Sequence, residues 1–158
     1  MLLVLAVNVC QGANTPAIIA SLQAQWRKSG VDSVNARLVA RWDHEMIPLL
    51  HQASTCEGQA LSLVFRLRDT TNATTHQAYA STLQKAMLTC PATILEAMPK
   101  EALAEVCALG DTADSFPGAL PEDLLRAQIA RLGDLHRSTL QGKVRHCVAL
   151  YQAALPAG

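Results

Sequence analysis

The sequence lacks the patterns that mark several large classes of protein. Its 158 residues contain no CxxC pair, no HExxH spacing, no Gly-x-Ser-x-Gly and no glycine-rich phosphate loop. Zinc ribbons, thioredoxin-type motifs and HExxH metalloproteases are therefore excluded, and the sequence signatures of α/β-hydrolases, P-loop proteins and Rossmann domains are missing. No internal repeat occurs at the periods of solenoid proteins. Without a ligand spacing or a nucleophile motif, we expect no metal and no cofactor.

Charge of either sign is scarce and balanced. Charged residues make up 16% of the chain, and 13 basic residues match 13 acidic ones. A net charge of zero gives no general attraction for nucleic acid or for an anionic membrane surface. No apolar run approaches the roughly 18 residues that a membrane span needs. We therefore expect a globular domain with no nucleic-acid partner and no membrane span.

The N-terminal segment is the longest unbroken apolar stretch, covering Leu2 to Val7. A short apolar run before Gly12 suits the end of an export signal, although no basic residue precedes it as signal peptides normally require. The alternative is a retained buried strand, but no further strands follow at βα spacing. We expect residues 1–12 to be a signal-peptide remnant or a dispensable segment, and residues 13–158 to form one helical domain.

The cysteines bear on the compartment. They are Cys10, Cys56, Cys90, Cys107 and Cys147. Cleavage after Gly12 would leave four, and an even number in an exported protein indicates two disulfides. The sequence thus favours a periplasmic or secreted protein. The alternative is a cytoplasmic protein in which the free thiols pack like small hydrophobic side chains.

Helix signals recur along the first half of the chain. Thr15-Pro16 suits a helix start and Gly30 a left-handed helix end, and a second helical pattern follows with Pro48 as its expected break. The stretch 60–69 fits both a half-buried strand and a helix. Because a lone strand would lack a partner, we favour the helix.

Proline and asparagine mark the later helices. Asn72 can cap a helix that continues to Cys90, Pro91 and Pro99 each restart a short helix, and Pro121 begins the last helical region. The whole pattern predicts an all-α, single-domain antiparallel helical bundle of five to seven helices with two disulfides.

Helix geometry bears on the pairing of the four cysteines. Cys56 begins one helix and Cys90 ends the next, so an antiparallel pair brings them close. This favours Cys56–Cys90 with Cys107–Cys147, which requires the last helical region to turn back at one of its glycines. The rival pairing, Cys90–Cys107 with Cys56–Cys147, stays open because the Cα separations are not fixed by sequence.

Polar clusters in the chain do not have the spacing of a catalytic or metal site. Neighbours in the run 41–46, Arg-Trp-Asp-His-Glu-Met, point in different directions on a helix, so a solvated polar face is expected. His44 and His51 are separated by a proline, and His136 and His146 do not share a face on an unbroken helix. Catalytic and metal-binding residues are therefore predicted to be none.

The segment Gly110–Pro121 is the longest expected loop and the best candidate for contact with a partner. It carries Asp111, Asp114 and Phe116, within a stretch from Glu96 to Asp123 that holds seven acids and one lysine. This acidic stretch either complements the basic C-terminal region within the fold or binds a basic partner. We expect the loop to be the most mobile internal segment.

These observations favour a small exported helical protein that binds another macromolecule, with a protein as the suspected partner, as an inhibitor, immunity-type or accessory factor. One alternative is a cytosolic helical adaptor with free thiols. Another is an enzyme whose catalytic residues lie too far apart in sequence to be recognised.

Overall fold

The protein is an all-α single domain. The computed structural model describes residues 15–108 and 121–155, and these ranges contain eight α-helices and no strand. The α-helices are α1 Thr15–Ala40, α2 Ile47–Ser54, α3 Gly58–Leu67, α4 Ala73–Thr89, α5 Pro91–Ala97, α6 Leu103–Val106, α7 Pro121–Gly133 and α8 Gln141–Ala154. Shorter turns are the π-helix η1 Trp42–Met46 and the 3₁₀-helices η2 Lys100–Ala102 and η4 Ser138–Leu140.

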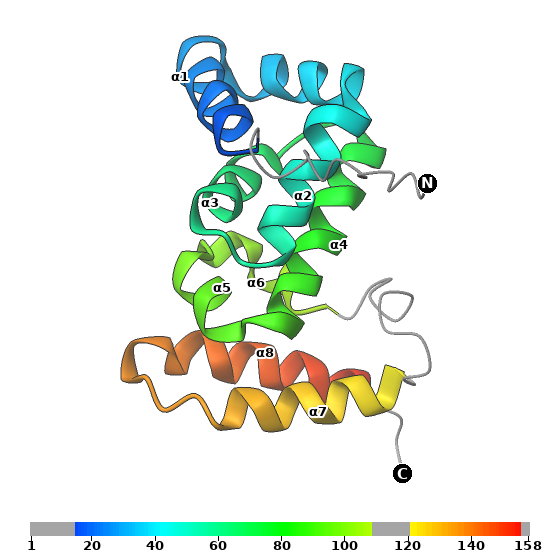
Figure 1. The fold of residues 1–158 in the computed structure, drawn as a ribbon. Coiled ribbons are helices and arrows are strands. Elements are labelled where there is room, and N and C mark those ends of the chain that lie inside the picture. The colour runs from blue at the N-terminus through cyan, green and yellow to red at the C-terminus, as the bar shows by residue number, and fades with distance from the viewer. Residues whose placement is uncertain (1–14, 109–120, 156–158) are drawn as a thin grey trace, which may run out of the picture.

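The helices are stacked from one end of the molecule to the other (Figure 1). Helix α1 covers one end, α2, α3 and α4 pack together in the middle, and α5 and α6 lie below them. Helices α7 and α8 pack side by side across the other end, and their axes cross that of α4 in Figure 1. The helices of the predicted antiparallel bundle therefore do not all run along one direction, because breaks at glycine and proline redirect the chain.

Gly30 divides α1 into two helical segments. Its backbone has φ 78°, in the left-handed region that favours glycine, as the sequence predicted for this position. The two segments fold beside each other and are joined by Gln25, whose Nε2 donates to the backbone oxygen and to Oγ of Ser33 at 3.1 and 2.9 Å. The glycine turn thus creates a surface formed by both segments.

The break expected at Pro48 lies a few residues earlier. The chain passes from α1 into η1, and α2 then begins at Ile47 with Pro48 in its first turn. Proline is tolerated in a first turn because its missing N–H would have no helical partner there. Pro48 therefore starts a helix, and the irregular backbone precedes it as a π-helix.

Two N-terminal caps define the central helices. The Glu57 carboxylate accepts hydrogen bonds from the backbone N–H groups of Gln59 and Ala60 and caps the start of α3. The sequence that fitted both a strand and a helix is therefore helical, as we expected. Asn72 Oδ1 accepts from the backbone N–H of Thr75 at 3.0 Å and caps α4. Both starts follow from local sequence.

The last helical region divides in two at Gly133, one of the two glycines where a turn was predicted. Together with the break at η1, this division raises the number of α-helices in the described ranges to eight, above the expected five to seven. The region from Pro121 therefore forms an antiparallel pair, α7 and α8, in place of one long helix.

Charges in the second half of the chain pair with each other within the fold. Glu96 forms an ion pair with Arg137, and Glu122 pairs with Arg126 one turn later on α7. Lys143 Nζ donates to the backbone oxygens of Leu95 and Met98, where a cation stabilises the end of α5. These contacts favour the interpretation that the acidic stretch and the basic C-terminal region complement each other within the fold.

One buried polar network joins three helices through the core. The fully buried hydroxyl of Tyr79 on α4 donates to Asn35 Oδ1 on α1 at 2.7 Å, and Asn35 Nδ2 donates to the backbone oxygen of Leu67 on α3 at 3.1 Å. Burial raises the pKa of Tyr79, so the hydroxyl stays protonated and donates. Tyr79 belongs to the same hydrophobic core cluster as apolar side chains of α1, η1, α2, α3 and α4, which include Leu22, Leu38, Met46, Leu49, Leu61, Leu63, Leu83 and Met87.

Replacing Tyr79 with phenylalanine should destabilise the fold by about 1–3 kcal/mol, because the buried Asn35 oxygen would lose its donor. Chemical denaturation of the purified protein measures this loss. The matched control is Tyr151→Phe: Tyr151 is also buried, but its hydroxyl has no hydrogen-bond partner among residues 15–108 and 121–155. The control should change stability by less than about 0.5 kcal/mol, and equal losses in the two variants would contradict the assigned role of the network.

Candidate functional site

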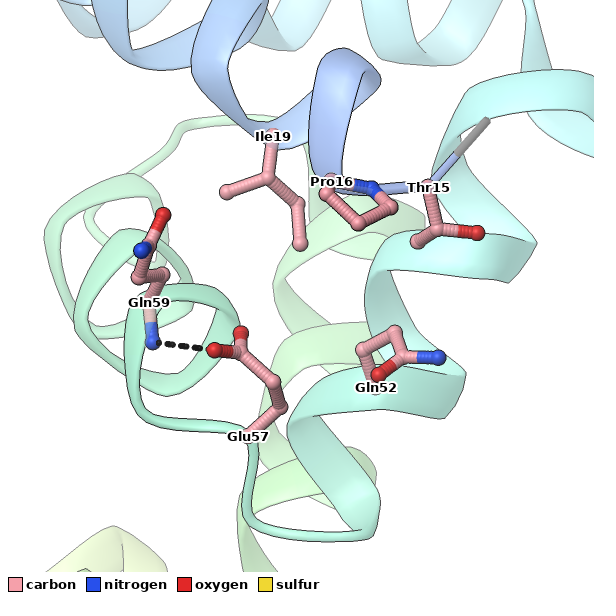
Figure 2. Close-up of a pocket in the computed structure, with 6 residues that line it drawn as sticks. All are labelled: Thr15, Pro16, Ile19, Gln52, Glu57 and Gln59. Atoms are coloured by element: carbon pink, nitrogen blue, oxygen red, sulfur yellow. Dashed lines mark hydrogen bonds between the residues drawn. The ribbon is translucent and has the colours of Figure 1, made fainter. Parts of the chain in front are cut away.

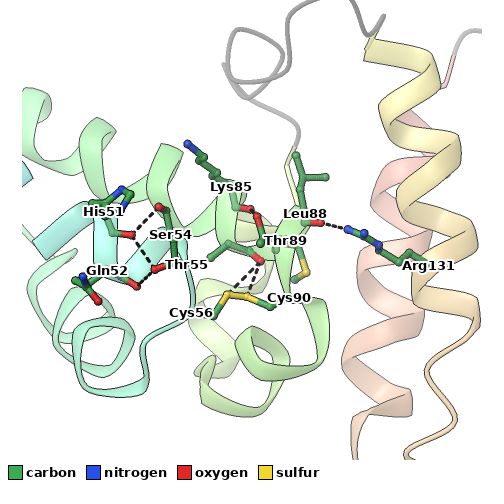
Figure 3. Close-up of a disulfide and its surroundings, with 12 residues drawn as sticks. His51, Gln52, Ser54, Thr55, Cys56, Lys85, Leu88, Thr89, Cys90 and Arg131 are labelled. Atoms are coloured by element: carbon green, nitrogen blue, oxygen red, sulfur yellow. Dashed lines mark hydrogen bonds between the residues drawn. A yellow bond between two sulfur atoms is a disulfide. The ribbon is translucent and has the colours of Figure 1, made fainter. Parts of the chain in front are cut away.

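The structure brings the four cysteines of the described chain into two pairs at disulfide distance. Cys56, in the turn before α3, lies beside Cys90 at the end of α4, with Cα atoms 6.6 Å apart. Figure 3 shows the bond between their sulfur atoms. The sulfur atoms of Cys56 and Cys90 lie 3.9 and 3.2 Å from the backbone oxygen of Ala86. Cys107, after α6, lies beside Cys147 of α8, with Cα atoms 5.1 Å apart. Both separations fall within the range of disulfides, and the pairs are the ones that helix geometry favoured.

The pairs join different parts of the stack. The first connects the α2–α3 turn to the α4–α5 junction, and the second connects α6 to the α7–α8 layer. Each closes a loop of more than thirty residues, with sequence separations of 34 and 40. Cross-links of this length stabilise a fold by roughly 3–4 kcal/mol in the chain-entropy account.

Other predicted positions lie outside the described residues or apart from one another. The expected export segment with Cys10, and the contact residues Asp111, Asp114 and Phe116, fall outside the described ranges. His136 and His146 are exposed. Within those ranges, no cluster of three or more His, Cys, Asp or Glu could hold a metal ion, and no helix is long and apolar enough to cross a membrane.

An open groove lies between the first segment of α1 and the junction of α1 with η1. Its volume is about 360 Å³. It is lined by Ala17, Ile18, Ser21, Arg37, Arg41, His44 and Glu45. The groove exists because the turn at Gly30 places residues near the start of α1 beside residues near its end. We treat it as the candidate binding site.

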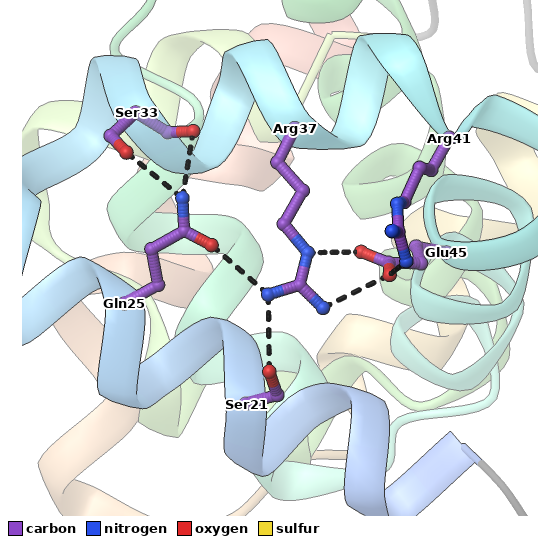
Figure 4. Close-up of polar contacts among 6 residues, drawn as sticks. All are labelled: Ser21, Gln25, Ser33, Arg37, Arg41 and Glu45. Atoms are coloured by element: carbon purple, nitrogen blue, oxygen red, sulfur yellow. Dashed lines mark hydrogen bonds and ion pairs between the residues drawn. The ribbon is translucent and has the colours of Figure 1, made fainter.

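Arg37 lines this site on the second segment of α1 and contacts two other segments, the first segment of α1 and η1 (Figure 4). Its Nε and Nη2 donate to the two oxygens of Glu45 at 2.6 and 2.9 Å. Its Nη1 donates to Ser21 Oγ and to Gln25 Oε1, both at 3.0 Å, on the first segment of α1. The forked guanidinium suits a carboxylate in this two-point geometry, and it fixes both α1 segments relative to η1.

Glu45 is the buried anion of the site, with a side chain only 5% exposed. Burial acts to raise the pKa of Glu45, but the hydrogen bonds and charges of Arg37 and Arg41 together outweigh it and hold the pKa below its ordinary value. The expectation of a fully solvated polar face in the run 41–46 is thus wrong at this position. Arg41 and Glu45 meet because they lie four residues apart, with Arg41 Nη1 2.9 Å from Glu45 Oε1.

The rim of the groove carries cationic donors that are not used by the fold. The Arg41 side chain is 64% exposed, and Nη1 to Glu45 is its single hydrogen bond within the described part of the chain. A guanidinium has five N–H donors, so most of those on Arg41 face solvent. His44 is also exposed. Ser21 Oγ accepts from a permanently charged guanidinium, which does not remove a proton, so the groove holds no activated nucleophile. Its chemistry suits binding an anionic group.

A second pocket, of about 240 Å³, lies between the start of α1 and the α2–α3 turn (Figure 2). Thr15, Pro16, Ile19, Gln52 and Gln59 line it together with Glu57. The Glu57 carboxylate already caps α3, as the dashed line in Figure 2 shows for one of its bonds. Both oxygens of the one charged side chain that lines this pocket thus accept bonds at the start of α3, so we assign Glu57 a capping role.

A polar cluster of His76, Arg68 and Glu105 holds α6 against the α3–α4 turn. Arg68 Nη1 lies 2.8 Å from Glu105 Oε2, and His76 Nδ1 lies 2.9 Å from the backbone oxygen of Arg68. Because a carbonyl only accepts, Nδ1 carries the hydrogen of this bond. Glu105 Oε1 is buried without a hydrogen bond from the described residues and lies 3.6 Å from His76 Nε2, whereas the other contacts of the cluster join α6 to the α3–α4 turn, and we assign the cluster a structural role.

Comparison with known proteins gives no relative for this chain: no family model, curated protein or solved structure matches it.

Replacing Glu45 with glutamine should destabilise the protein by about 1–3 kcal/mol at neutral pH, because the partly buried Arg37 loses its charged partner. The free energy of unfolding should also change less with pH. In the parent protein the folded state holds the pKa of Glu45 below its unfolded value of about 4.3, so the carboxylate stabilises the fold above that pH. This stabilisation is lost as the pH falls through the lower, folded-state pKa.

Denaturant titrations between neutral pH and pH 3 measure both effects. Glu122→Gln is the control, because the pair between Glu122 and Arg126 is exposed and adds less than about 0.5 kcal/mol. A Glu45→Gln variant as stable as this control at neutral pH would contradict the role of the buried carboxylate.

Proposed function

We propose that this protein is a disulfide-linked helical protein of an oxidising compartment, periplasmic or secreted, that acts by binding another macromolecule. It would serve as an inhibitor, immunity-type or accessory factor. The observation that carries the proposal is the open groove of α1 and η1, which offers unused cationic donors beside apolar side chains and contains no activated nucleophile. Such a surface supports recognition.

The cysteine geometry supports the location. Cys56 with Cys90 and Cys107 with Cys147 lie at Cα separations that allow bonding without moving the backbone. Disulfides persist in oxidising compartments and are rare in the cytosol, where thiols are kept reduced. Each of the two cysteine pairs joins separate layers of the fold, as expected of disulfides that stabilise a folded structure.

Protein isolated from its native host without reductant should contain no alkylatable thiol at these four positions. Alkylation followed by peptide mapping measures the modification at each position and identifies any linked peptides. A Cys107→Ala, Cys147→Ala double variant is the control, since its Cys56–Cys90 peptide should stay linked. Four free thiols in the parent protein would favour the cytosolic adaptor, and a peptide linking Cys90 to Cys107 would overturn the pairing.

Binding is tested with a photo-crosslinking amino acid placed at exposed positions and activated in the native host. A position that lines the groove is compared with one on α8, for example His44 and Arg145. We expect discrete crosslinked species whose masses give a defined macromolecular partner. If neither position yields a crosslink, and the purified protein instead consumes a small-molecule substrate, the enzyme alternative replaces this proposal.

A further inference from the structure

We infer that the groove of α1 and η1 binds an acidic side chain, aspartate or glutamate, presented by a protein partner beside an apolar residue. This inference rests on the proposed binding function and names the chemistry that the partner brings.

The charges that line the groove leave one full positive charge uncompensated. Arg37 and Arg41 both contact Glu45, whose lowered pKa keeps it anionic. Because Arg37 uses Nε and Nη2 on that carboxylate, the pair of Arg37 and Glu45 is neutral. Arg41 is then the excess charge, and His44 adds to it when protonated.

Arg41 is held where it can make a second contact. Its Nη1 is anchored on Glu45 at 2.9 Å, while 64% of its side chain remains exposed. An anchored guanidinium loses less conformational entropy on binding than a free one, and its planar donors match a carboxylate in a two-point contact. The site is therefore preorganised for one carboxylate.

An apolar surface accompanies the charge. Ala17 and Ile18 form part of the groove lining, opposite the polar side. Ala17 is exposed and Ile18 is half-buried, so both can contact a partner. A partner segment with an acidic residue next to an aliphatic one would match Arg41 and this apolar side of the groove.

The charge pattern favours a carboxylate on a protein over a phosphate on a nucleic acid. Nucleic-acid sites depend on several basic side chains that neutralise successive phosphates. Here Arg41 is the one guanidinium in excess over the carboxylate of the groove, Asp43 lies two residues from it in sequence, and the whole chain has no net charge. One carboxylate balances one guanidinium, so a protein partner is the occupant that fits.

The test uses the ¹⁵N-labelled full chain titrated with a blocked synthetic peptide, acetyl-Leu-Glu-Leu-amide, followed by NMR chemical shifts. Acetyl-Leu-Gln-Leu-amide and inorganic phosphate are the comparison probes. We expect the acidic peptide to shift the signals of residues that line the groove. Its affinity should exceed that of the neutral peptide by about tenfold, as the loss of a charged hydrogen bond implies.

Two charge-neutralising variants complete the experiment. Arg41→Gln should lower the affinity for the acidic peptide by about tenfold, and Arg145→Gln, at an exposed arginine on α8, should leave it unchanged. Glutamine places no second carboxylate against the buried Glu45, and the spectrum of the free variant verifies that the fold is preserved.

Equal binding of the two peptides, shifts away from the groove, or an equal response to phosphate would each overturn the inference. Such a result would leave the proposed function intact if photo-crosslinking still identified a partner. Failure of crosslinking at both positions, with peptide binding retained, would instead count against the proposed function.

Discussion

The ion pair between Arg37 and Glu45 is the interaction on which the N-terminal end of the molecule depends. Arg37 lies on the second segment of α1, reaches the first segment through Ser21 and Gln25, and reaches η1 through the buried carboxylate. A largely buried pair of this kind adds little net stability, but removing one partner leaves the other uncompensated, at a cost of about 1–3 kcal/mol for the partly exposed Arg37. Its contribution is therefore to select one arrangement of three segments, and the groove is the surface that this arrangement produces.

Local signals made much of the fold predictable from sequence. Gly30, Asn72, Pro91 and Pro121 act through the backbone of their own turn, so their effects do not depend on distant residues. The break before Pro48 was misplaced because proline fits the first turn of a helix as well as it ends one. The π-helix has no such local signal, since it is stabilised by contacts of its side chains with α1.

The site was harder to predict than the fold, because it depends on contacts between residues that are distant in sequence. The run 41–46 looks like an ordinary polar face, and the four-residue spacing of Arg41 and Glu45 is typical of exposed helical pairs. The burial of Glu45 depends on Arg37 and on Ser21, which is brought near by the turn at Gly30. The cysteine pairing was more accessible, because the order of helices and the ends at which cysteines lie restrict which thiols can meet.

The two ends of the molecule are held together by different chemistry. In the described chain, no cysteine precedes Cys56, so α1 and η1 are held by the ion pair, the polar network of Asn35 and the apolar core. One cysteine pair joins the α2–α3 turn to the end of α4, and the other joins the end of α6 to α8. Reductant should therefore act first on the middle and C-terminal layers, whereas acid acts first on the N-terminal end, where the stabilising carboxylate titrates.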